Sequence, residues 1–185
     1  QFLDHVVRVD SFFNGQVLVS AFPALLRAGY ACLGANVRTL GNDTTCVHEQ
    51  IILDLAAYVC WLKDRHGIEK VVWLGNSGGG SLGGLYQQQA KLPGAHRLAH
   101  TPAGRPTVLR DARMPPFDAM MITAAHTGQG LIMNEVIDPA VIDEDDPLLT
   151  DPSLDMYDPA NGFRPAPAWS RYDPAFVQRY RAAQL

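Results

Sequence analysis

The chain has 185 residues, of which 47% are apolar and 18% are charged, and its formal net charge is −4. This length supports one domain with a substantial core, and the negative charge gives no electrostatic reason to expect a nucleic-acid partner. No apolar run approaches the roughly 18 residues that cross a bilayer, so we expect no membrane span.

The first third of the chain predicts two strands and two helices in alternation. A β-branched run within 4–13 predicts a strand, and apolar residues at helical intervals within 15–29 predict a helix that ends at Gly29. Residues 30–37 are almost continuously apolar, as in a parallel strand that is covered on both faces. Apolar residues recur at helical spacing over 46–66, and Gly67 stands where a left-handed cap is expected.

The middle of the chain continues the alternation. Residues 70–74 predict a strand, 79–92 a helix, and 117–125 one more buried strand after an irregular connection. Repeated strand–helix units with right-handed crossovers predict an α/β fold with a mostly parallel sheet that is flanked by helices.

The last quarter of the chain has a different composition. Residues 138–174 are rich in Pro and Asp, which predicts a lid or surface segment, and residues 173–184 predict a short helix. We therefore expect a core at 1–137 and a lid or cap at 138–185. The acidic run at 143–146 lacks the spacing of a calcium loop, so we interpret it as a solvated loop and expect no metal or cofactor.

One glycine-rich turn contains the residues that indicate a catalytic function. It fits G-x-S-x-G between a strand and a helix, and it consists of Gly75, Asn76, Ser77, Gly78 and Gly79. Such a tight turn points the serine hydroxyl out at the carboxyl edge of the sheet and turns the following amide toward an attacked carbonyl. Three further glycines would let the helix approach the sheet closely: Gly80, Gly83 and Gly84.

Three other interpretations of this turn compete with a nucleophile. A phosphate-binding loop requires a lysine after its last glycine, and none follows. A dinucleotide fingerprint can be spelled with Gly78, Gly80 and Gly83, but the acidic residue about 20 positions on is missing. A structural turn without chemistry is the third possibility.

The motif GNSGG, with "PALLRAGYACLGANVRTLGND" before it, resembles the α/β-hydrolase superfamily. The resemblance implies that Ser77 is the nucleophile and that the Gly78 amide forms half of an oxyanion hole. The family's usual His-Gly pair is replaced by "DSFFNG", so the second donor is expected near Phe12 or Phe13. Only one strand follows the helix after this turn, where the family has about three, and the family's early hairpin strands are not evident before His5. The fold is therefore expected to be incomplete at both ends, with the usual acid and histidine beyond Leu185.

The best internal candidate for the base is His126, because it follows the strand 117–125 at the same edge of the sheet as Ser77. A polar residue that caps a loop is the alternative for His126. Histidines 48, 96 and 100 are weaker candidates, and His66 is expected on the surface. For the acid, Asp43, Asp118 and Asp138 have no spacing that distinguishes them from solvated carboxylates.

These residues predict a serine hydrolase that acts through an acyl-enzyme on an ester or related carbonyl. Phe163, Trp169 and Tyr172 either form an apolar wall for a small-molecule substrate with an apolar part or hold the lid on the sheet. One alternative is a catalytically inactive binding or scaffold protein with the same fold. Another is an acyltransferase or thioesterase that uses the same serine. Three cysteines without metal spacing predict incidental thiols in a reducing, cytoplasmic compartment.

Overall fold

The computed structural model describes residues 5–10, 21–39, 42–146 and 148–185. The chain divides into two compact units, 1–128 and 129–185, and each is described by itself. The division that the sequence predicts after residue 137, with a lid or cap role for the second part, stays a prediction. Within the described ranges, no helix has the length and apolar character needed to cross a bilayer.

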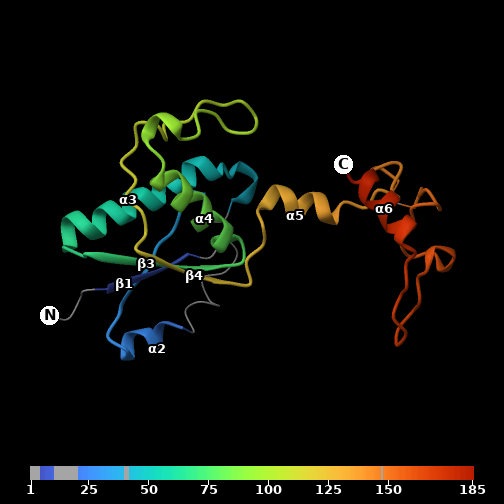
Figure 1. Ribbon diagram of the computed structural model, residues 1–185, viewed down its shortest axis with the longest axis horizontal. Coiled ribbons are helices and arrows are strands. Elements are labelled where there is room, and N and C mark those ends of the chain that lie inside the picture. Colours follow the sequence, from blue (N-terminus) through green and yellow to red (C-terminus); the bar gives the residue numbers. More distant parts are fainter. Residues whose placement is uncertain (1–4, 11–20, 40–41, 147) are drawn as a thin grey trace. The chain divides into compact units, whose positions relative to one another are not determined.

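The first unit is built on a parallel sheet (Figure 1). Its strands are β1 (His5–Asp10), β2 (Ala31–Gly34), β3 (Lys70–Asn76) and β4 (Ala119–Thr123). They lie in the order β2-β1-β3-β4, and all three pairings are parallel. The expected α/β fold with a mostly parallel sheet is therefore confirmed, and the carboxyl ends of β3 and β4 lie side by side.

Helices cover both faces of this sheet (Figure 1). Helices α3 (His48–His66) and α4 (Gly78–Lys91) lie on one face, and α2 (Phe22–Arg27) lies on the other. Short 3-10 turns η1 (Asp43–Thr45) and η2 (Gly94–His96) interrupt the connections. The predicted start of the first helix, at 15–20, lies outside the described residues.

The main core lies between α3, α4 and the sheet. Residues at helical spacing on α3 are fully buried, as the sequence predicts, and Gly67 caps the helix with a φ of 63°. The indole of Trp73 stacks on Phe117 with ring centroids 5.1 Å apart, and Tyr86 also packs against Phe117. This aromatic group fills the space between β3 and α4.

Strand β4 is where the prediction of a buried strand is wrong. The strand forms, but Met121 and Ile122 are about half exposed, at 50% and 53%. In the described residues β4 pairs only with β3, so its other edge has no neighbouring strand. The apolar run predicts the burial that a central parallel strand would have, and β4 lies at an end of the described sheet.

The second unit contains α5 (Gln129–Val136), a 3-10 turn η3 (Pro159–Asn161) and α6 (Pro174–Ala183). The sequence predicts α6, and Asp173 caps it by accepting a hydrogen bond from the Ala175 amide. Helix α5 is not predicted, because it is short and has Gly130 in its first turn. Many aspartates accept from the amide two residues on, which explains the turn-rich character of this segment: Asp143, Asp146, Asp151, Asp155 and Asp158.

The aromatic residues of the second unit have different environments. Tyr172 stacks on the buried Phe176, and Phe163 packs edge-on against Tyr157. Trp169 is 88% exposed. Within the second unit, Phe163 and Tyr172 thus pack against their neighbours, whereas the Trp169 indole lies open.

Candidate active site

Ser77 occupies the turn between β3 and α4, and its backbone is strained. Its φ is 51° and its ψ is −124°, in a region that side-chain-bearing residues rarely adopt. Among the described residues, the non-glycine positions with positive φ are Ser77 and Ala124. Such a conformation costs on the order of 1–3 kcal/mol and persists where the surrounding structure enforces it.

Close packing of the helix on the strand enforces the turn. A Cβ added to Gly75 would lie 2.6 Å from the carbonyl oxygen of Gly79 and 2.5 Å from the Trp73 Nε1 atom. The Trp73 indole itself donates to the Gly79 carbonyl oxygen over 3.1 Å. Glycine is thus required at position 75 because the first turn of α4 passes directly over it, as G-x-S-x-G predicts.

The helix glycines confirm the predicted close approach at two of three positions. A Cβ on Gly83 would overlap the Trp73 indole, and one on Gly80 would lie 2.8 Å from the Ile122 Cγ2 atom. A Cβ on Gly84 would meet nothing within 4 Å, so the prediction for Gly84 is wrong.

Hydrogen bonds connect the turn at Ser77 to the end of β4. The Ser77 amide donates to the Thr123 carbonyl oxygen over 3.0 Å. The Thr123 hydroxyl donates to Asn76 Oδ1 over 3.1 Å. Asn76 therefore braces the turn against β4. The sequence does not predict these two hydrogen bonds of Thr123, because they form only when β4 pairs with β3.

The first amides of α4 lie beside Ser77. Gly80 donates its amide to the Ser77 carbonyl oxygen over 3.0 Å, whereas the Gly78 amide has no acceptor among the described residues. At a helix N-terminus, such an amide stands at the positive end of the helix dipole. The Gly78 amide is thus available to an anion. The second donor expected near Phe12 or Phe13 lies outside the described residues.

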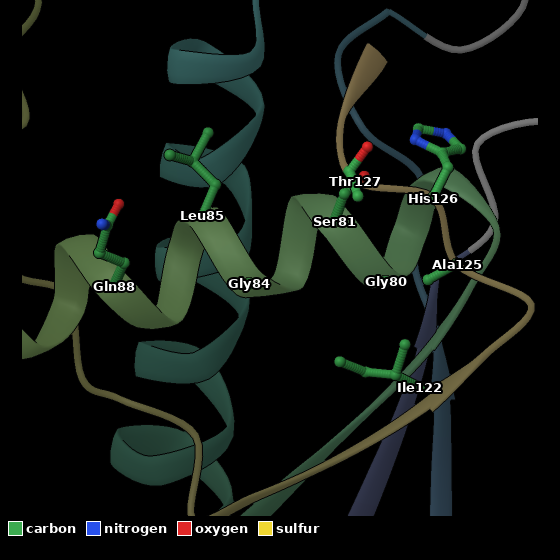
Figure 2. A pocket seen from close by; sticks show the side chains of 9 residues that line it. All are labelled: Gly80, Ser81, Gly84, Leu85, Gln88, Ile122, Ala125, His126 and Thr127. Atoms are coloured by element: carbon green, nitrogen blue, oxygen red, sulfur yellow. The ribbon is translucent and has the colours of Figure 1, made fainter. Parts of the chain in front are cut away.

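His126 lines a groove beside α4 (Figure 2). The groove has a volume of about 490 Å³, and Ser77 is not one of its lining residues. Leu85 and Gln88 project from α4, Ile122 belongs to β4, and His126 and Thr127 follow that strand (Figure 2). The His126 Nδ1 atom accepts the Gly128 amide over 3.1 Å. A neutral ring that accepts at Nδ1 carries its proton on Nε2.

The remaining candidates occupy ordinary structural positions. Asp118 accepts from the Val71 amide over 2.8 Å, just before β4 and so at the opposite end of that strand from His126. Asp138 accepts from the Ala140 amide and, over 3.4 Å, from the Tyr180 hydroxyl, within the second unit. Asp43 begins η1, but its side chain is outside the described part of the chain.

Four histidines also have structural explanations. His66 contacts the Trp61 ring, with centroids 4.1 Å apart, at the end of α3. His48 begins α3, His96 ends η2, and His100 forms an isolated bridge with Pro106.

Two of the three thiols are less acidic than usual. Burial raises the pKa of Cys32. Burial is also the largest cause of the raised pKa of Cys60. A raised pKa keeps a thiol protonated at neutral pH, and a protonated thiol is a weak nucleophile and a weak metal ligand. In the part of the chain that the structure describes, no group of three or more His, Cys, Asp or Glu residues could hold a metal.

A comparison with known families agrees with this geometry. A family model described as alpha/beta hydrolase fold matches residues 10–99. The matched span contains β2, α3, β3 and α4, and therefore the entire turn around Ser77. No curated protein and no solved structure matches the chain.

Proposed function

The chain belongs to the α/β-hydrolase superfamily, and from this premise we propose that it is a serine hydrolase that acts on an ester or a related carbonyl. The observation that carries the proposal is the backbone of Ser77, whose φ of 51° is held between β3 and α4. A strained serine on a sharp strand-to-helix turn is the arrangement that exposes a nucleophilic hydroxyl in this superfamily.

The proposed reaction is acyl transfer through Ser77. The Ser77 Oγ atom attacks the carbonyl carbon and loses its proton to a base, while the Gly78 amide donates to the oxyanion. The alcohol leaves with a proton, and water then attacks the acyl-enzyme and releases the acid. Asn76 holds the turn in place through Thr123. The apolar side chains of Leu85 and Ile122 line the groove beside α4 and favour a small-molecule substrate with an apolar part.

His126 is the base that we propose, on the basis of its place after β4 at the carboxyl edge of the sheet. The hydrogen bond from the Gly128 amide imposes a requirement on this role. Nε2 carries the proton in the neutral ring, so His126 takes a proton from Ser77 only after the ring exchanges its tautomer and releases that amide.

The proposal is tested by labelling the intact chain with a fluorophosphonate. We expect a mass increase on the peptide that contains Ser77, because the reagent requires an activated serine beside an oxyanion hole. The Ser81→Ala variant is the matched control, since Ser81 lies one helical turn away and its hydroxyl donates to the Gly78 carbonyl oxygen. Folded protein that stays unlabelled at Ser77 would refute the proposal.

The role of His126 has its own test. We expect His126→Asn to slow the labelling of Ser77 by about 100-fold, because general-base catalysis typically contributes 10²–10⁴. Asparagine retains an acceptor for the Gly128 amide, so the loop stays in place while the ring is removed. The rate is measured from the time course of the mass increase. A rate equal to that of the unaltered chain would exclude His126 as the base.

The second candidate function is a binding or scaffold protein that retains the fold without catalysis. The observation that favours it is the hydrogen bond at His126 Nδ1, which leaves no basic nitrogen available to Ser77 in this arrangement. The two functions differ in the labelling experiment above. An acyltransferase or thioesterase would be labelled as well, and it is recognised when an added alcohol or thiol diverts the acyl group from water.

A further inference from the structure

A second cavity of the first unit lies at the N-terminus of α3, and it shares no lining residue with the groove beside α4. Its volume is about 190 Å³. Its walls come from the first turns of α3, from Arg38 in the connection before that helix, and from the loop that spans 101–108. The proposed nucleophile therefore does not account for this cavity.

Glu49 is the unusual residue in the wall of this cavity. It is the second residue of α3 and is only 8% exposed. Among the described residues, its carboxylate has neither a hydrogen-bond donor nor an ion-pair partner. The helix dipole gives a carboxylate near a helix N-terminus only a small stabilisation, whereas burial of a carboxylate without a hydrogen-bond donor is strongly unfavourable. A donor from a ligand would satisfy this carboxylate.

Two arginines also line the cavity, and they differ in whether a carboxylate already pairs with the guanidinium. The Arg38 guanidinium is already matched by Asp54, which it contacts from Nε over 3.0 Å and from Nη2 over 2.6 Å. Arg105 stands in the loop, is exposed, and has no ion-pair partner in the described part of the chain. The Arg105 backbone is fixed through Thr101, whose hydroxyl oxygen accepts its amide over 3.1 Å. The cavity thus presents one unmatched carboxylate and one unmatched guanidinium.

We propose that this cavity binds a small zwitterion, with the ligand's ammonium on Glu49 and its carboxylate on Arg105. Paired charges of opposite sign favour a ligand that carries one of each, and the hydrogen bonds that they form are charge-assisted. The apolar walls at Leu53, Pro106 and Val108 suit an aliphatic side chain. A free aliphatic amino acid has this chemistry and fits the volume. The inference stands independently of the proposed acyl transfer.

The test compares leucine with its two halves by calorimetry on the intact chain. Isopentylamine retains the ammonium without the carboxylate, and 4-methylpentanoate retains the carboxylate without the ammonium. We expect leucine to bind about ten-fold or more tightly than either half, which corresponds to about 1.4 kcal/mol. Equal binding of isopentylamine would overturn the proposal in favour of a cation site, and no binding of leucine at millimolar concentration would overturn it altogether.

Two variants assign the contacts. Glu49→Gln is expected to weaken leucine and isopentylamine by about ten-fold and to leave 4-methylpentanoate unchanged. Arg105→Ala is expected to weaken leucine and 4-methylpentanoate and to leave isopentylamine unchanged. Glu69→Gln is the matched control, because Glu69 is exposed and lies outside the cavity. Arg105→Ala alters only an exposed side chain, so it decides the matter alone if Glu49→Gln impairs folding. Leucine binding that neither variant changes would overturn the assignment.

Discussion

Replacement of Ser77 by alanine is expected to lower the turnover of a p-nitrophenyl ester by about 10³-fold or more. The reason is that the proposed covalent step passes through the Ser77 hydroxyl, and no other group of the turn can take its place. Alanine carries a Cβ like serine and is strained to the same degree at this φ, so we expect the free energy of unfolding to change by less than about 0.5 kcal/mol. Initial rates and a urea titration measure the two quantities separately.

A second substitution at the same position separates chemistry from strain. Ser77→Gly also removes the hydroxyl, but glycine adopts a φ of 51° without steric cost. The relief of about 1–3 kcal/mol exceeds the entropic cost of glycine, so we expect a net gain of about 1 kcal/mol in stability together with the same loss of turnover. Ser81→Ala should retain turnover. Ester turnover that survives in Ser77→Ala would assign the activity to another residue.

Replacement of Gly83 by alanine is expected to destabilise the fold by about 3 kcal/mol. The added Cβ would overlap the indole of Trp73, which is fully buried and stacks on Phe117. The indole has no space to retreat, so α4 must move away from β3 and weaken the core between them. The measurement is the free energy of unfolding from urea titration, followed by tryptophan fluorescence.

Gly84→Ala is the matched control for that change, one residue further along the same helix. A Cβ at Gly84 meets nothing within 4 Å. Alanine is the better helix former, so we expect a gain of about 0.5–1 kcal/mol. The two variants make the same chemical change in the same helix and are expected to shift stability in opposite directions. If both shifted stability equally, helix propensity rather than contact with Trp73 would explain the result.

Much of the fold can be predicted from the sequence where local pattern and tertiary environment agree. Helix α3 has apolar residues at helical spacing and a glycine that caps it, and both features are local. Strand β3 and the turn at Ser77 are predicted for the same reason, because G-x-S-x-G specifies a tight strand-to-helix connection. The prediction of a buried β4 is wrong because exposure depends on the neighbours of a strand and not on its own residues.

The candidate site shows the same division. The residue types alone indicate Ser77 and Gly78. A tight strand-to-helix turn leaves no room for side chains two positions before and after the serine, and glycines stand at both of these positions. The residue types do not distinguish Gly83 from Gly84, because only the position of the Trp73 ring decides which glycine has no room for a Cβ. They also do not predict the hydrogen bond that determines the tautomer of His126.

By itself, the sequence determined the class of fold, the order of its elements and the turn that presents Ser77, because periodicity, caps and glycine spacing act over a few residues. The tertiary structure alone decided which side chains surround that turn and how Thr123 braces it. It also placed Glu49 and Arg105 around one cavity. These relations join residues that lie far apart in the chain, and they arise only when the strands pair and the helices pack.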